Sequence, residues 1–195
     1  MDMAKALWVR RAMLVVCGAA LGIAIDTAWR HSGMPTVSAQ QNAPRSLEAV
    51  SAEVTRLTSL LPSNSHIMMD VQFHWTNLWF AGQKKNWPLA TFYFDESRSH
   101  MMWMIRKSPT VRSRIDGKDV DVKSIFEAVD TSSLADVMKA IEKKDVAQFS
   151  AAYKTMLESC YACHKSAGRA YLRPMIPREP AQTVINFDPA ATWPE

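Results

Sequence analysis

Glycine is scarce in this chain of 195 residues, which contains only six glycines and no glycine-rich loop of the kind that cradles phosphate groups. No segment of any length alternates apolar and polar residues as a strand would, and no internal repeat is present. Charge of one sign is also lacking: 23 basic residues face 19 acidic ones, and the basic residues are scattered. Nucleic acid is therefore not an expected partner.

The composition is that of one globular domain. Hydrophobic residues make up 48% of the chain and charged residues 22%, which is enough apolar material for a single core. Collagen-like, low-complexity and wholly disordered chains are excluded.

The N-terminal segment has the pattern of an export signal. Lys5, Arg10 and Arg11 precede an apolar run over residues 12–25, which is too short to span a bilayer as an untilted helix of about 20 residues. We expect a signal peptide over residues 1–39, cut after Ala39, and hence a periplasmic protein. An uncleaved N-terminal membrane anchor is the alternative.

The rest of the chain predicts an all-α protein. Apolar residues recur at three- and four-residue spacing, and Ser46 and Asp145 stand where helix N-caps are expected. We predict a four-helix bundle over residues 65–173, an N-terminal extension over 40–64 that holds an extra amphipathic helix, and a proline-rich irregular tail over 174–195. The predicted helices cover residues 46–61, 65–86, 89–107, 121–144 with a break near 130–133, and 145 to about 167.

Two non-helical segments are expected. Ser108-Pro109 and Asp116-Gly117 mark a loop, and the five prolines between residues 174 and 194 exclude regular structure in the tail. The tail also carries large apolar residues such as Ile176 and Phe187. We therefore expect it to lie against the bundle or against a partner.

The chemistry of the sequence lies at Cys160-Tyr161-Ala162-Cys163-His164, the Cys-x-x-Cys-His pattern of covalent c-type haem attachment. On a helix, positions i and i+3 present both sulfurs on one face, so that each thiol can add across one haem vinyl group. The adjacent His164 would be the proximal ligand of the iron. One covalent haem c is the expected cofactor.

Three other interpretations of these residues compete with haem attachment. A thioredoxin-like dithiol would follow a strand, and none is predicted here. A disulfide between positions i and i+3 of a regular helix has poor geometry. A zinc site would need a fourth ligand from His66, His74 or His100. Export, the lack of other cysteines after residue 39 and the apolar stripe that leads into the motif all favour haem.

The position of the motif suggests a family. Only 31 residues follow His164, whereas class I c-type cytochromes carry the motif near the mature N-terminus. From residue 65 to 171, the chain resembles the class II cytochromes of the c-prime type. The resemblance implies a four-helix bundle with haem bound from the final helix through Cys160, Cys163 and His164. It also implies that the helix over 65–86 covers the opposite face of the haem. The extra helix at 46–61 and the tail depart from the family.

Other ligands of the haem can be nominated from the sequence. His74 is the first candidate for the distal iron ligand, Met68 and Met69 follow, and His100 is a further alternative. A hydrogen-bonded core role for His74 and plain packing for the methionines remain open. Among the basic residues, Lys165 and Arg169 lie near enough to the motif to pair with the haem propionates. Arg98, Arg106 and Arg173 are more distant candidates.

We expect a non-enzymatic electron carrier that docks transiently with redox partner proteins. The alternative is a haem protein that binds or senses nitric oxide, carbon monoxide or oxygen at an open distal site. A peroxidase, which would use His74 or His100 with Arg98, is a third possibility. A homodimer is compatible with each function.

Overall fold

The computed structural model describes residues 46–182 and 184–192. The predicted signal peptide, with its cut site, and the first residues of the extension lie outside the described residues. The chain divides into two compact units, one up to Leu60 and one from Leu61, and each is considered by itself. No helix in the described part of the chain is long and apolar enough to cross a bilayer.

The first unit contributes α2 (Leu47–Leu60), which confirms the extra helix. Its N-terminus is capped as the sequence predicts, because Ser46 Oγ accepts a hydrogen bond from the amide of Ala49 at 3.1 Å. The helix buries none of its own residues. Its exposed apolar side chains are Leu47, Val50, Val54, Leu57 and Leu60.

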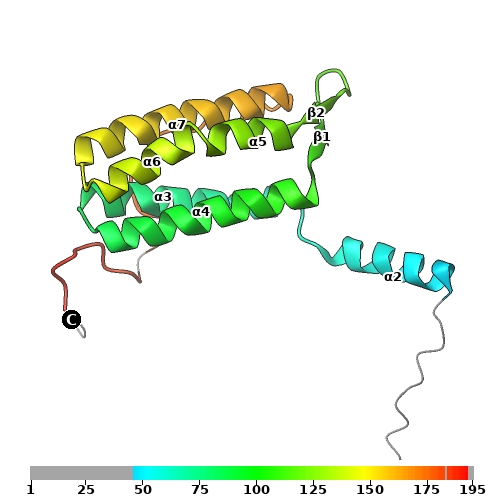
Figure 1. Ribbon diagram of the computed structural model, residues 1–195, viewed down its shortest axis with the longest axis horizontal. Helices are drawn as coiled ribbons and strands as arrows, with labels where there is room; N and C mark the ends of the chain where they lie inside the picture. The colour runs from blue at the N-terminus through cyan, green and yellow to red at the C-terminus, as the bar shows by residue number, and fades with distance from the viewer. Residues whose placement is uncertain (1–45, 183, 193–195) are drawn as a thin grey trace, which may run out of the picture. The chain divides into compact units, whose positions relative to one another are not determined.

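The second unit begins with a helical hairpin of α3 (Asn64–Gln83) and α4 (Trp87–Lys107), which run antiparallel (Figure 1). Both starts are fixed by side-chain caps: Ser63 Oγ accepts from the amide of His66, and Asn86 Oδ1 accepts from the amide of Leu89. Pro88 stands in the first turn of α4, where its missing N–H costs nothing. Both helices were predicted, and their observed ends differ from the predicted ones by a few residues at most.

A short β-hairpin follows where only a loop was predicted. Strands β1 (Thr110–Arg112) and β2 (Asp119–Asp121) pair antiparallel, with Val111 opposite Val120. Gly117 occupies the turn with a φ of +68°, a conformation that favours glycine. Strands of three residues are too short to display an alternating pattern, which is why the sequence did not reveal them.

The remaining helices are α5 (Val122–Asp130), α6 (Ser133–Glu142) and α7 (Val146–Ser166). The predicted break between 130 and 133 is confirmed, since α5 ends before Thr131. The predicted cap of the last helix is confirmed as well: Asp145 Oδ1 accepts from the amide of Gln148 at 2.9 Å. The described chain is thus mostly helical, and the all-α class is confirmed with this small two-stranded sheet added.

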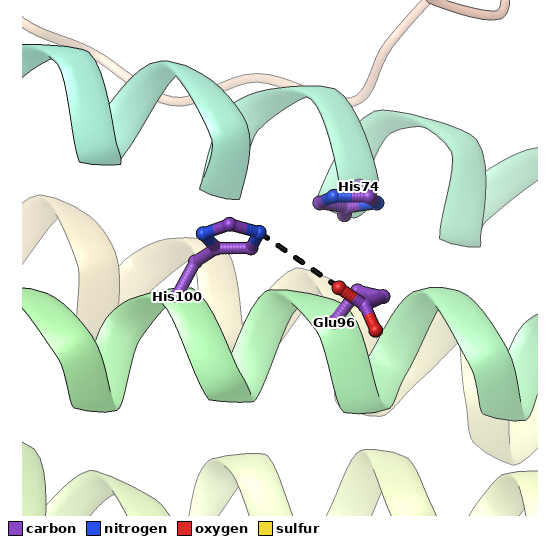
Figure 2. Close-up of side chains that lie close together, drawn as sticks. All are labelled: His74, Glu96 and His100. Atoms are coloured by element: carbon purple, nitrogen blue, oxygen red, sulfur yellow. Dashed lines mark ion pairs between the residues drawn. The ribbon is translucent and has the colours of Figure 1, made fainter. Parts of the chain in front are cut away.

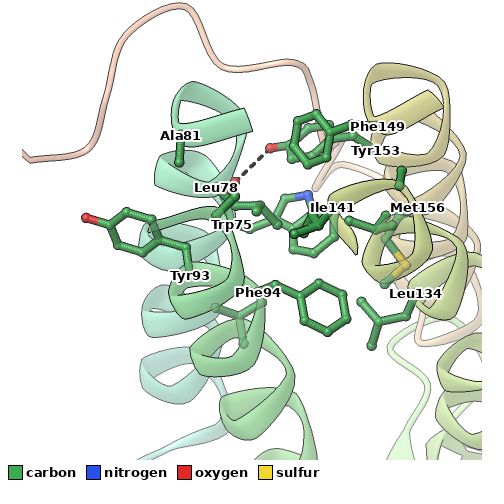
Figure 3. Packing of buried hydrophobic residues seen from close by; sticks show 14 of the residues in the cluster. Trp75, Leu78, Ala81, Tyr93, Phe94, Leu134, Ile141, Phe149, Tyr153 and Met156 are labelled. Atoms are coloured by element: carbon green, nitrogen blue, oxygen red, sulfur yellow. Dashed lines mark hydrogen bonds between the residues drawn. The ribbon is translucent and has the colours of Figure 1, made fainter. Parts of the chain in front are cut away.

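The core lies between the α3–α4 hairpin and the layer formed by α5, α6 and α7 (Figures 1 and 3). Tyr153 of α7 is its anchor, because its ring stacks on Trp75 at 5.0 Å and its hydroxyl donates to the carbonyl of Trp75 at 2.9 Å. The α3 backbone comes so close to Phe149 that only glycine fits at position 82. Fully or almost fully buried side chains around these include Leu78, Tyr93, Leu134, Ile141 and Met156.

The tail has no helix or strand in its described residues, as predicted, and it lies against the hairpin. Phe187 packs beside Phe80 and Tyr93, with ring centroids 6.3 and 6.2 Å away. Two side chains of the hairpin also hold the tail backbone: Asn86 Nδ2 donates to the carbonyl of Phe187, and Asn77 Oδ1 accepts from the amide of Ala181. Of the two expected positions for the tail, the bundle surface is the observed one.

Candidate functional site

The Cys-x-x-Cys-His motif occupies the C-terminal turns of α7. The buried positions Phe149, Tyr153 and Met156 recur at helical spacing, and the same stripe continues into Cys160 and Cys163. Both cysteines are free and partly buried, and Cys160 packs against the hydrophobic core. The helix therefore presents the two thiols on one face, as the spacing predicted.

Burial keeps both thiols protonated at neutral pH. It raises the pKa of Cys160 to about 12, with a smaller contribution from Cys163. Burial also raises the pKa of Cys163, against the opposing charge of Arg169. Reactive dithiols of the thioredoxin kind depend on the opposite shift, toward a thiolate at neutral pH. These thiols lack that activation.

The imidazole of His164 is held by the chain that follows α7. Its Nδ1 lies 2.8 Å from the carbonyl oxygen of Leu172. A carbonyl only accepts hydrogen bonds, so in the neutral imidazole Nδ1 carries the proton and Nε2 keeps a free lone pair. Fixing the tautomer through a carbonyl is the usual support of a metal-binding histidine.

A tight backbone turn brings Leu172 back to His164. Gly168 has a φ of +71°, and its amide donates to the carbonyl of Lys165 at 2.9 Å, while the amide of Arg169 donates to the carbonyl of His164 at 2.7 Å. These two bonds form a Schellman motif. The β1–β2 hairpin adjoins this turn: the amide of Arg114 donates to the carbonyl of Ala167, and a Cβ at position 168 would lie 2.6 Å from the Arg114 nitrogen.

The register between α3 and α7 determines which α3 residue faces the motif. Trp75 and Tyr153 are in contact, and the two helices run in opposite directions (Figure 1). Moving seven residues along each helix, about 10 Å and two turns, leads from Tyr153 to Cys160 and from Trp75 to Met68. Met68 is partly buried against the same core as Cys160.

The other predicted distal ligands lie elsewhere. The side chain of Met69 is exposed, with 63% of its surface accessible. His74 and His100 face each other between α3 and α4, with nearly parallel rings 5.2 Å apart. Burial lowers the pKa of His74, and the neighbouring His100 lowers it further. The structure therefore brings neither histidine to the motif.

The two predicted propionate partners differ in their surroundings. Arg169 is partly buried, donates to the carbonyl of Ala167 at 3.2 Å and acts electrostatically on Cys163. Lys165 is exposed and places its ammonium group 4.9 Å from the ring centre of Tyr161. Arg98 forms a two-pronged ion pair with Asp130 and is therefore already engaged.

Two contributors were not identified from the sequence. Gly168 follows directly after the predicted end of the last helix, and it also directs the chain back over His164. Leu172 gave no signal, because a backbone carbonyl acts through its position and any residue type could supply it. The combination of thiols with His66, His74 or His100 into a zinc site does not form: among the described residues, the cluster with metal-ligand geometry is His74, Glu96 and His100.

Comparisons of the chain with protein-family models, curated proteins and solved structures found no match.

Proposed function

We propose that this chain is an exported monohaem c-type cytochrome that transfers single electrons. The observation that carries the proposal is the C-terminal end of α7, where two free thiols spaced i, i+3 precede an imidazole whose Nε2 is available. The sequence pattern and the local geometry support it independently, because the orientation of His164 by Leu172 is not implied by the motif itself.

The residues of this region suit a covalent haem. Cys160 and Cys163 would form the thioether bonds, and His164 Nε2 would bind the iron. Arg169, which is held close to Cys163, is the better candidate for a propionate partner, with Lys165 as the second. When bound, the haem supplies the one-electron couple of its iron, and the surrounding protein sets the potential.

Met68 favours an electron carrier over a gas-binding protein. Its thioether is the α3 group that the Trp75–Tyr153 contact aligns with Cys160, so it is the side chain best situated to occupy the distal position. Methionine opposite histidine is an axial pair that raises the reduction potential. This proposal replaces His74, Met69 and His100 with Met68 as the first distal candidate.

We further propose that the helical unit is a four-helix bundle of the class II type. In this bundle, α3, α4 and α7 are the first, second and fourth helices, and α5 and α6 together make the third. The contacts of α3 with α4, of α6 with α7 and of α3 with α7 support this arrangement. Export to the periplasm and transient docking of redox partners near the end of α7 belong to the same proposal.

The test is the visible spectrum of the full chain produced in a host with haem-attachment machinery. We expect a c-type spectrum that survives acid-acetone extraction, a mass gain of one haem, and ferrous bands that carbon monoxide does not change. Cys160→Ala with Cys163→Ala should abolish the colour, and Met68→Ala should convert the protein to a carbon monoxide-binding form.

Met69→Ala is the matched control for Met68→Ala, since the two residues are neighbours and Met69 points to solvent. It should leave the spectrum unchanged. A colourless purified protein would overturn the haem assignment. A wild-type protein that takes up carbon monoxide readily would retain the haem and replace electron transfer with gas binding.

A further inference from the structure

A second group of metal-binding side chains lies between α3 and α4, away from the cysteines. Asp70 and His74 are four residues apart on α3, and Glu96 and His100 are four residues apart on α4. Residues at i and i+4 share one face of a helix, so each helix supplies one carboxylate and one imidazole on a common face. The antiparallel pairing of α3 with α4 turns these two faces toward each other (Figure 2).

The ligand atoms of this group lie close enough together to bind one metal ion after small side-chain movements. His74, Glu96 and His100 each offer a ligand atom, and the three atoms lie within 4.8 Å of one another. His100 Nε2 lies 3.8 Å from Glu96 Oε2, and its Nδ1 lies 3.8 Å from Asp70 Oδ2. Neighbouring ligands around a tetrahedral ion with bonds of 2.0–2.1 Å are about 3.3 Å apart, so rotamer adjustments of about 1.5 Å or less would complete the shell.

The imidazoles lack hydrogen-bond partners of their own. Nδ1 of His74 and Nδ1 of His100 are both inaccessible to solvent and unpaired in the described structure. Leaving a buried polar atom unsatisfied costs about 1–3 kcal/mol, so a native structure that retains two such atoms side by side needs a reason. A bound cation supplies one: it can take up Nδ1 of His74 directly, and binding to Nε2 of His100 would keep the proton of that ring on Nδ1, on the side of Asp70.

The charges around the group are also of one sign. The charged neighbours that act on His74 are Glu96 and Asp70, alongside His100, and no lysine or arginine is among them. Metal binding requires unprotonated imidazoles, and with these the two carboxylates give a local charge that a divalent cation balances. The aromatic rings of Phe73, Phe92 and Tyr93 surround His74 and exclude part of the water.

We propose that His74, Glu96 and His100 bind a divalent transition-metal ion of the zinc type, with Asp70 as a positioning residue on the Nδ1 side of His100. Two imidazoles and a carboxylate suit Zn²⁺, Ni²⁺ or Cu²⁺ and disfavour Ca²⁺ and Mg²⁺, which prefer oxygen ligands only. Asp70 would accept the Nδ1 proton of His100 and leave Nε2 for the metal. The fourth position is available to water.

This site is independent of the haem proposal. It lies on two helices that carry none of the thioether cysteines, and its two histidines are residues that the sequence nominates for the distal haem face. Assigning His74 and His100 to a second metal explains why the two imidazoles face each other between α3 and α4 and do not face the motif at the end of α7.

The test is calorimetric titration of the full chain with ZnCl₂ after chelator treatment. Because free thiols also bind Zn²⁺, the titration is performed on the Cys160→Ser, Cys163→Ser variant as well as on the wild type. We expect one ion per chain in that variant, unaffected by millimolar Mg²⁺. His100→Gln and Glu96→Gln should each weaken binding by about 100-fold or more, and Asp70→Asn by about 10- to 100-fold.

His66→Gln is the matched control, because His66 is an exposed histidine on the same helix and should leave the affinity unchanged. Circular dichroism of each variant verifies that it folds. Should a variant fail to fold, Glu96→Gln, which changes only one partly buried carboxylate to an amide of the same shape, decides the matter. Absence of binding by the Cys160→Ser, Cys163→Ser chain, or binding that the folded Glu96→Gln and His100→Gln variants retain in full, would overturn the proposal.

Discussion

At the scale of single residues, Gly168 determines how His164 is presented. The residue adopts a left-handed conformation, and the Schellman bonds that follow from it return the chain so that the Leu172 carbonyl reaches the imidazole. The backbone of Arg114 lies against its α-carbon. Two separate physical requirements, a positive φ and the lack of a side chain, meet at one position.

Replacing Gly168 with alanine should therefore lower the free energy of unfolding by about 2–3 kcal/mol, from the conformational cost and the clash with Arg114 together. Urea denaturation followed by circular dichroism measures this. Gly117→Ala is the control: φ is +68° there, but nothing lies within 4 Å of the new Cβ, so only the conformational cost of about 1–2 kcal/mol applies. Equal losses in the two variants would contradict the close contact.

The residue scale also shows why the distal candidates could not be ranked from the sequence. Met68 and Met69 are adjacent, and a rotation of about 100° around α3 separates a core position from an exposed one. Because α3 carries aromatic residues on most of its faces, its apolar pattern does not reveal which face meets α7. His74 belongs to the same stripe as Leu78 in sequence, yet it faces α4 and His100.

At the scale of elements, the helix ends that carry capping or breaking residues were predictable from the sequence. Ser46, Asp145 and the polar break after Asp130 carry local signals, since capping and breaking depend on neighbours in the sequence. The β-hairpin depended on its pairing partner and on contact with the end of α7, which no local pattern encodes. That the two thiols of the motif share one helix face was predictable for the same reason, because it depends only on their spacing. The contact of the Leu172 carbonyl with His164 was not predictable.

The cap of α7 gives a prediction at this scale. Asp145→Ala removes the acceptor for the Gln148 amide and should lower the free energy of unfolding by about 1 kcal/mol. Thermal denaturation should show a corresponding decrease in Tm. Ser132→Ala is the comparison, because Ser132 is the N-cap residue of α6 but makes no side-chain capping bond. Ser132 Oγ instead donates to the carbonyl of Ala128 at 2.6 Å, so this variant measures an exposed side-chain bond outside a cap. A loss as large as that of Asp145→Ala would contradict a specific contribution of the cap.

At the scale of the whole helical unit, the tail packs on the outside of the α3–α4 hairpin and is bonded to it. Its contacts join residues about a hundred positions apart, through the bonds from Asn86 to Phe187 and from Ala181 to Asn77. Phe187 of the tail packs beside Tyr93, whose ring centre lies 6.1 Å from that of His74, so the tail and the proposed zinc-type site share this neighbour.

Phe187→Ala should therefore lower the free energy of unfolding by about 2 kcal/mol, less than a fully buried phenylalanine because the ring is only partly covered. Limited proteolysis should then cleave the tail faster than in the wild type. Val184→Ala, at a side chain with 85% of its surface exposed, should change neither property. A tail that stays protected in Phe187→Ala would show that the two asparagine bonds hold it alone.

The position of Leu172 has a consequence for biogenesis. A ribosome releases the chain from its N-terminus, so the cysteines and His164 emerge before the carbonyl that orients the imidazole. A chain that ended before residue 172 would carry all five motif residues without the carbonyl that orients the His164 imidazole. Under the haem proposal, the complete ligand set therefore exists only after the last segment has folded back onto the end of α7.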